Sequence, residues 1–105
     1  MRLYDTPKWK KKRHRINRDS GYMCELCLRK GIRASAEAVH HIVPLECSDT
    51  LKLKDYNLIS LCWQCHEKMH KRQSHKLTDA GIELVKELVQ QNYIPARVLD
   101  IISKA

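Results

Sequence analysis

The sequence predicts a small α+β fold in which a strand, a loop, a second strand and a helix form the centre of a single domain. The first observation behind this prediction is a set of two Cys-x-x-Cys pairs, a pattern typical of a structural zinc site. The second is a pair of short apolar runs, one between the cysteine pairs and one leading into the second pair. The third is an amphipathic pattern at each end of the chain, which predicts flanking helices.

Composition limits the size of the core. With 105 residues, 43% hydrophobic side chains, 6% aromatic ones and no Phe, the chain can build only one modest aliphatic core. Small domains with such a core are often stabilised further by a bound metal ion. The sequence has no run of about 18 apolar residues that could span a membrane, and its basic N-terminus lacks the apolar stretch of a signal peptide. We therefore expect a cytoplasmic protein whose spaced cysteines bind metal rather than form disulfides.

Positive charge is concentrated in the part of the chain that holds the cysteines. Residues 1–75 contain 16 Lys or Arg and 8 Asp or Glu, whereas residues 76–105 contain 4 of each, for a net charge of +8. Such charge favours binding to a nucleic-acid backbone, with a merely solvated helix face or an acidic protein partner as the alternatives. The candidate phosphate-binding residues lie in the densest basic run and are Lys8, Lys10, Lys11, Lys12, Arg13 and Arg15.

The N-terminal segment has the pattern of a capped helix. Thr6 is a typical N-cap and Pro7 suits the first helical position, so we expect a helix from Pro7 to about Arg18. Trp9 and Ile16 fall at helical spacing and are expected to face the core. Trp9 could instead stack on a nucleic-acid base, but an anchoring position in the core is favoured.

Cys24, Cys27, Cys62 and Cys65 are predicted to bind one structural zinc ion. The second pair begins 35 residues after Cys27. Closing so long a loop costs entropy, but zinc–thiolate binding of order 10 kcal/mol at neutral pH offsets that cost. Cys47 has no partner at this spacing and is expected to be a free thiol.

The central segment predicts the order strand, polar loop, strand, helix. We expect the strands at Glu37–Val43 and Leu58–Leu61, and a helix from Trp63 through His70 to about residue 73. His66 and His70 would then share one helix face, a spacing at which two imidazoles can bind one metal ion.

The chain after residue 76 is expected to form two helices packed on the rest. Thr78 can cap a helix that ends near Asn92, and Pro95 can begin a short last helix. We therefore divide the chain into residues 1–76, including the basic helix, and 77–105, with docking of a partner on the two helices as the alternative. The apolar residues expected to face the core are Ile82, Val85, Leu88 and Val89 in the first helix, and Val98, Leu99, Ile101 and Ile102 in the second.

The motif formed by His40-His41, Asn57 and His66, framed by the two cysteine pairs, resembles that of an HNH endonuclease of the ββα-metal (His-Me finger) superfamily. The segments V-H-H-I-V-P and N-L-I-S-L-C-W-Q-C-H are similar to those of small, zinc-knuckled members carried by bacteriophages and mobile elements. The resemblance covers roughly residues 9–70 and leaves the tail outside.

The resemblance implies a role for each histidine of the motif. His41 would be the general base, and His40 and His66 would bind the catalytic metal ion. Asn57 would steady the loop and the base by hydrogen bonding. His70 stands where some members have a third metal ligand and others have none. Neighbours on a strand point to opposite faces, which fits a division of His40 from His41.

The expected activity, as the resemblance implies it, is metal-dependent hydrolysis of double-stranded DNA. One site would nick one strand and leave 5′-phosphate and 3′-hydroxyl ends. The catalytic metal ion, a second divalent ion besides the structural zinc, could be Mn, Ni, Zn, Co or Mg. Because its histidine ligands offer nitrogen atoms, we expect more activity with Mn or Ni than with Mg. A phage packaging terminase is a possible partner for a monomer or weak dimer of this kind in a bacterial or phage-infected host. A non-catalytic zinc module that binds DNA or RNA, or a zinc-stapled adaptor, are the alternatives.

Overall fold

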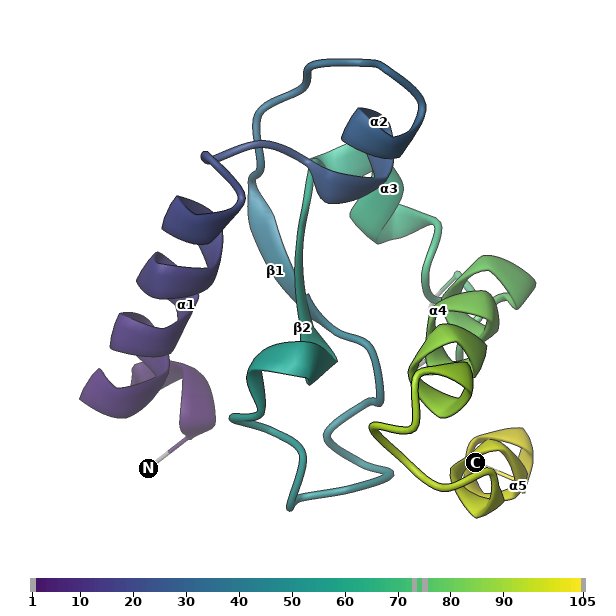
Figure 1. The fold of residues 1–105 in the computed structure, drawn as a ribbon. Helices are drawn as coiled ribbons and strands as arrows, with labels where there is room; N and C mark the ends of the chain where they lie inside the picture. Colours follow the sequence, from purple (N-terminus) through teal and green to yellow (C-terminus); the bar gives the residue numbers. More distant parts are fainter. Residues whose placement is uncertain (1, 73, 75, 105) are drawn as a thin grey trace.

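A two-stranded antiparallel sheet lies at the centre of the computed structural model, which describes residues 2–72, 74 and 76–104 (Figure 1). Strand β1 spans Ala38–His41 and β2 spans Leu58–Leu61. In their register, His40 pairs with Ile59. β2 has the predicted bounds, while β1 is shorter than the predicted strand because the chain bends directly after it.

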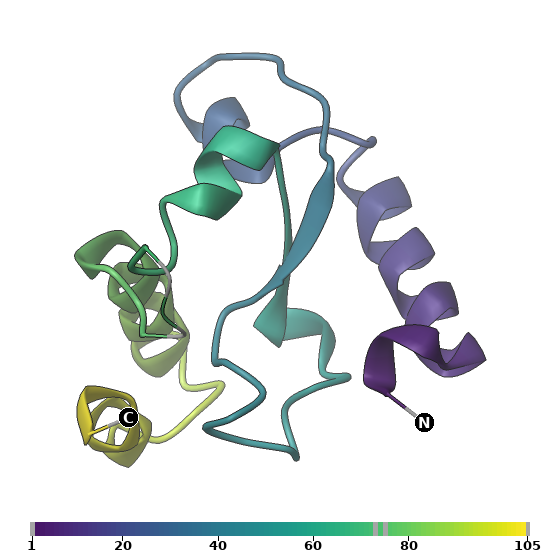
Figure 2. The ribbon, with the colours of Figure 1, turned by 180° about the vertical axis from the view of Figure 1, so that it is seen from behind.

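Helices lie on both sides of the sheet and at one end of it (Figures 1 and 2). The basic helix α1 lies on one side, and the two C-terminal helices α4 and α5 lie on the other. The short helices α2 and α3 lie together at the end where β2 leads into α3. The helical bounds are η1 Leu3–Asp5, α1 Pro7–Asp19, α2 Glu25–Arg29, η2 Asp55–Asn57, α3 Trp63–Glu67, α4 Asp79–Gln90 and α5 Arg97–Lys104.

The predicted caps of α1 and α4 are confirmed. Thr6 Oγ1 accepts a hydrogen bond from the backbone N–H of Trp9 at 3.2 Å, and Thr78 Oγ1 accepts one from that of Gly81 at 3.2 Å. Each hydroxyl thereby satisfies one of the N–H groups that a helix start leaves unpaired. Trp9 is buried as predicted, and Ile16 is half-buried.

The prediction for α3 was wrong at its C-terminal end. The helix ends at Glu67 rather than near residue 73. Tertiary hydrogen bonds with the start of the tail replace the helical ones: His70 forms a β-bridge with Leu77, and Thr78 N donates to Met69 O at 2.9 Å. Gln73, where the helix was expected to end, and His75 lie outside the described residues.

The hydrophobic core runs from the sheet into the C-terminal helices. Gly81 is part of this packing, because a Cβ atom at Gly81 would lie 2.5 Å from the carbonyl oxygen of Met69. Ile101 was expected to face the core but is 47% exposed, because α5 packs through the face that carries Val98 and Ile102. The core includes Ile42, Val43, Ile59, Leu61, Met69, Leu77, Leu84, Val85, Leu88, Ile94, Val98 and Ile102. Within the residues described, no helix has the length and apolar character that crossing a membrane requires.

Candidate active site and metal centres

The four predicted zinc ligands come together between α2 and α3. Cys27 Sγ lies 3.8 Å from Cys62 Sγ and 3.7 Å from Cys65 Sγ, and the ligand atoms of all four cysteines lie within 4.8 Å of one another. Sulfurs bound to one tetrahedral zinc ion at about 2.3 Å would be about 3.8 Å apart. Cys24, Cys27, Cys62 and Cys65 are therefore placed to hold a metal ion. Cys47 is outside this group and is half-buried beside the core.

The fold favours the thiolate form at Cys24, whereas burial is the main cause that raises the pKa of the Cys65 thiol to about 12. Cys24 immediately precedes α2 and Cys62 immediately precedes α3, so each pair lies at the partially positive start of a helix. Burial raises the pKa of the Cys24 thiol, but hydrogen bonds from the backbone of Cys62 and Cys27 outweigh burial and bring this pKa to about 7. Cys24 can thus bind a metal ion at neutral pH with little cost of deprotonation.

Three histidines from different parts of the chain form a second cluster, which we call the histidine trio. The ring centroid of His40 lies 5.5 Å from that of His66 and 5.4 Å from that of His70, and the last two are 6.4 Å apart. Three imidazoles bound to one tetrahedral metal ion have centroids about 5.3 Å apart. The structure therefore brings the predicted ligands together, although His70 reaches the cluster from beyond the end of α3 rather than from the helix itself.

Within this trio, His40 offers a buried donor atom that a divalent metal ion could bind. His40 is 2% exposed, and its buried Nε2 has no hydrogen-bond partner among the described residues. An unpartnered polar atom in the interior is costly unless something else binds it. Burial, reinforced by the positive charges that His66 and His70 can carry, lowers the pKa of His40 to about 3. His40 is therefore a neutral imidazole with a lone pair to donate.

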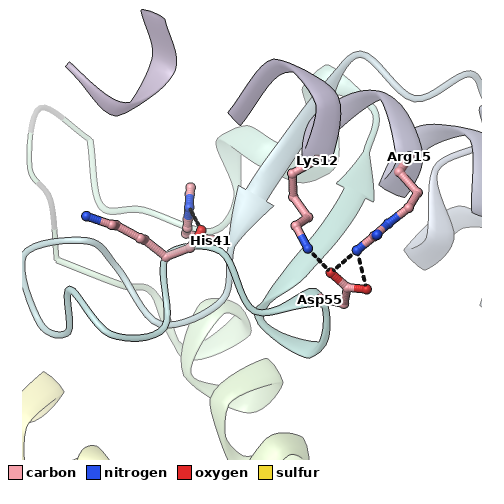
Figure 3. Close-up of polar contacts among 5 residues, drawn as sticks. Lys12, Arg15, His41 and Asp55 are labelled. Atoms are coloured by element: carbon pink, nitrogen blue, oxygen red, sulfur yellow. Dashed lines mark hydrogen bonds and ion pairs between the residues drawn. The ribbon is translucent and has the colours of Figure 1, made fainter. Parts of the chain in front are cut away.

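His41 has separate contacts on the other side of β1. Its ring stacks on Trp9, with centroids 5.0 Å apart and planes 20° apart, and its Nε2 lies 3.0 Å from the carbonyl oxygen of Lys52. Figure 3 shows His41 at this loop. A carbonyl oxygen only accepts hydrogen bonds, so Nε2 carries the proton and Nδ1 keeps its lone pair. Burial lowers the pKa of His41 against the opposing effects of the Lys52 carbonyl and the Glu46 carboxylate. The ring is therefore neutral and basic at pH 7.

The histidine trio and His41 open into the same pocket of about 400 Å³. β1 ends at His41 and the chain bends at the next two residues, so the pocket reaches side chains from both faces of the strand. Tyr4 lies at its edge, with its ring 5.3 Å from Trp9 and 6.1 Å from His41. The pocket is lined by Tyr4, Val39, His40, His41, Pro44, Leu45, Glu46, His66 and His70.

Asn57 holds the loop that carries the His41 partner. The side chain is fully buried, and its Oδ1 accepts a hydrogen bond from Val43 N at 2.7 Å. Its Nδ2 donates to Val43 O and to Leu51 O, each at 3.2 Å. Leu51 adjoins Lys52, so Asn57 connects the start of the loop between β1 and β2 to the part of the loop that carries Lys52, and it does not line the pocket.

The basic residues of α1 fall into two groups. Lys12 Nζ lies 2.5 Å from Asp55 Oδ1, and Arg15 Nη2 lies 2.6 Å from both Asp55 oxygens, so these side chains reach from α1 to η2 (Figure 3). Hydrogen bonding to Lys12 is the main reason that the pKa of Asp55 is lowered. These partly exposed ion pairs contribute little stability, but they leave Lys12 and Arg15 partly neutralised. The other four candidates are exposed and have no ion pair among the described residues: Lys8, Lys10, Lys11 and Arg13.

Comparison with known proteins identifies the family. The family model for HNH endonuclease matches residues 24–72. No curated protein matches the chain. A crystal structure of the HNH endonuclease of the deep-sea thermophilic bacteriophage GVE2, solved with a manganese ion, is 32% identical to it. That match covers 62% of this chain and 71% of the phage chain, with a TM-score of 0.61. The chain belongs to the HNH endonuclease family. It is a nuclease, and its substrate is DNA.

Three contacts in this HNH endonuclease are absent from the sequence prediction. The partner of His41 is a main-chain carbonyl, that of Lys52, which no residue type can signal. The stacking of Trp9 on His41 was not foreseen because the pattern of α1 showed only that Trp9 faces inward. Tyr4 precedes the predicted helix, and its place at the pocket depends on the turn η1.

Proposed function

We propose that this HNH endonuclease hydrolyses double-stranded DNA one strand at a time, leaving 5′-phosphate and 3′-hydroxyl ends. His41 is the general base, and His40, His66 and His70 hold the catalytic metal ion. The observation that carries the proposal is the pocket that the neutral His41 ring shares with the histidine trio. Asn57 is a positioning residue in this scheme, because it acts through the loop and not on DNA.

The chemistry divides between the two sides of β1. A divalent metal ion held by the trio supplies positive charge beside the scissile phosphate. His41 Nδ1 takes a proton from the attacking water, while the Nε2–H bond to Lys52 O keeps the ring in the tautomer that can do so. Because burial lowers the pKa of His41, the ring is neutral at pH 7 and its Nδ1 lone pair is available for this proton. As the water oxygen bonds to phosphorus, the bond from phosphorus to the 3′-oxygen breaks, and the 3′-oxygen takes a proton from solvent to give the 3′-hydroxyl end.

We further propose that the four-cysteine site holds zinc, since a set of four thiolates at these distances suits a tetrahedral soft-ligand ion. DNA would approach along the exposed basic residues of α1, which contact the backbone without specifying sequence. We assign residues 1–76 to the nuclease domain and 77–105 to an extension packed on it. A monomer or weak dimer that works beside a packaging terminase fits a chain similar to a phage enzyme.

The experiment that tests this function is cleavage of supercoiled plasmid by the purified protein, with and without a chelator. The wild type should produce open circles before linear DNA, and ligase should reseal the nicks because their ends are 5′-phosphate and 3′-hydroxyl. His41→Ala should abolish cleavage and leave zinc content and folding unchanged. Cleavage by this variant at the wild-type rate would refute the role of His41, and a wild type that binds but never cuts DNA would make the chain a non-catalytic module.

The metal preference is tested in the same assay. We expect more cleavage with Mn or Ni than with Mg, because the trio offers three nitrogen ligands and Mg prefers oxygen. Best cleavage with Mg would contradict the proposed ligand set. Elemental analysis should find one firmly held zinc per chain that remains after the catalytic metal has been dialysed away.

A further inference from the structure

We propose that Trp63, Lys71 and Arg72 form a nucleotide-binding site beside the histidine trio, which stacks one unpaired base next to the scissile phosphate. This inference rests on the proposed function, because it takes the trio as the place where the phosphate is cut. It adds a preference that the nuclease function does not include: DNA with a base already out of the helix, at a loop or mismatch, is cut faster than fully paired DNA.

The site is a second pocket that adjoins the first at two shared lining residues. It has a volume of about 780 Å³ and shares His66 and His70 with the pocket that contains His41. A strand whose phosphate lies at the trio therefore extends its next nucleotide into this space. The remaining lining residues are Trp63, Glu67, Lys71, Arg72 and Ser74.

Trp63 is an exposed aromatic ring on a rigid support. Its side chain is 53% exposed, although the ring would be costly to leave in water, and it takes no part in the core. It lies between two of the metal-binding cysteines, and its backbone N–H donates to a Glu37 carboxylate oxygen at 3.3 Å. The ring centroid is 5.7 Å from that of His66. An exposed indole ring held in a fixed position next to the proposed cleavage site can stack on a nucleic-acid base.

The charges of the pocket favour a phosphate. Lys71 and Arg72 are both exposed, and neither forms an ion pair with any residue that the structure describes. Glu67 contributes one opposing carboxylate, so these groups leave the pocket with a net positive charge. On α1, by contrast, Asp55 already neutralises part of the basic charge of Lys12 and Arg15.

The preference for unpaired bases follows from the cost of stacking. A base inside a duplex is stacked on its neighbours, and taking it out costs free energy that a mismatch or a loop has already supplied. Stacking on Trp63 would then add to binding only where the base is free to move. We expect the specificity constant, kcat/KM, to be about tenfold higher for such sites, near the low end of the effect that one base–aromatic stack produces.

The test compares two labelled duplexes of the same sequence, one fully paired and one with a short unpaired loop. The wild type should cut beside the loop about tenfold faster than at the paired site. Trp63→Phe should keep most of this ratio, and Trp63→Ala should reduce it to near one, with unchanged zinc content and circular dichroism. The inference is overturned if Trp63→Ala keeps the wild-type ratio, or if the wild type shows no preference.

The cations are tested separately, which also covers the case in which Trp63→Ala folds poorly. Arg72→Gln should raise KM for both duplexes and lower the slope of log affinity against log salt by roughly one. Arg97→Gln, an equally exposed change of charge at the start of α5, is the matched control and should alter neither. Equal effects of the two variants would refute a phosphate contact at Arg72.

A binding measurement separates this inference from the proposed function. In the His41→Ala background, a fluorescent base analogue such as 2-aminopurine placed in the loop should be quenched when the protein binds. The quenching should disappear with Trp63→Ala, because Trp9 is buried at 2% exposure and cannot reach the base. If the wild type cuts no DNA, the proposed function fails, while the quenching still decides whether Trp63 stacks a base.

Discussion

Replacement of Asn57 by alanine tests whether this buried amide holds the active-site loop. Among the described residues, the Asn57 side chain makes three hydrogen bonds, to Val43 N, Val43 O and Leu51 O, and it does not line the pocket. The change removes all of them and leaves the Val43 N–H without its partner at a residue that has no exposed surface. We therefore expect a loss of stability and, through the loop, a loss of activity.

The size of the stability loss follows from these contacts. A buried donor left unpaired costs about 1–3 kcal/mol, and each further hydrogen bond contributes about 0.5–1.5 kcal/mol. Together these terms predict that Asn57→Ala lowers the free energy of unfolding by about 3 kcal/mol. For a domain of this size, that loss corresponds to a fall in Tm of roughly 15 °C.

The activity loss follows from the partner of His41. Leu51 adjoins Lys52, whose carbonyl oxygen lies 3.0 Å from His41 Nε2, so a loop released at Leu51 no longer fixes the base. A displacement of about 1 Å in a reacting group can cost about a hundredfold in rate. We expect a fall in kcat of about that size, with KM within twofold because Asn57 does not touch DNA.

The assay is thermal unfolding together with plasmid nicking, measured well below the Tm of the variant. Ser60→Ala is the matched control. Ser60 lies in β2 and is buried like Asn57, but among the described residues its side chain makes one hydrogen bond, to Asn17 Oδ1 at 2.8 Å. The control should lose about 1 kcal/mol and keep its kcat. The reasoning is refuted if Asn57→Ala unfolds within a few degrees of the wild type, or if it is stable and yet weakens DNA binding.

Three further predictions follow from other contacts. Trp9→Ala should expose His41 to water and raise its lowered pKa toward 6.5, so the acid side of the kcat profile at saturating metal should move to higher pH; an unchanged profile would contradict the burial effect. Cys27→Ser should abolish firm zinc binding and cooperative unfolding, as checked by elemental analysis and circular dichroism. Gly81→Ala should lower the free energy of unfolding by about 1–3 kcal/mol because its Cβ would meet Met69 O at 2.5 Å; denaturant titration measures this, and a stabilised variant would contradict the close packing.

The features that could be predicted from the sequence are those set by local spacing. Thr6 and Pro7 define the start of α1 because a cap and an N-terminal proline act within one turn. The cysteine grouping was predictable because two pairs at this spacing serve few other purposes in a reducing environment. The division of roles between His40 and His41 was implied by the family resemblance, and the alternation of side chains along a strand fits it.

The features that could not be predicted depend on contacts distant in sequence. The pattern after Trp63 favours a continued helix, but the β-bridge between His70 and Leu77 ends it early. The choice of Lys52 as the partner of His41 depends on the path of a loop, and its main-chain carbonyl carries no sequence signal. The pairing of Lys12 with Asp55 likewise depends on where α1 lies against η2.

The histidine trio depends on three supports that belong to different parts of the fold. His40 is held by the register of β1 on β2, and His66 follows Cys65 directly, so the cysteine site fixes the helix that presents it. His70 lies in the segment that pairs with Leu77 and adjoins Met69, which packs against Gly81. A change in any one support therefore moves a different histidine of the trio, and the tail takes part in placing His70 even though the family resemblance ends before it. The cysteine site and the segment that pairs with Leu77 thus position the trio from opposite ends of α3.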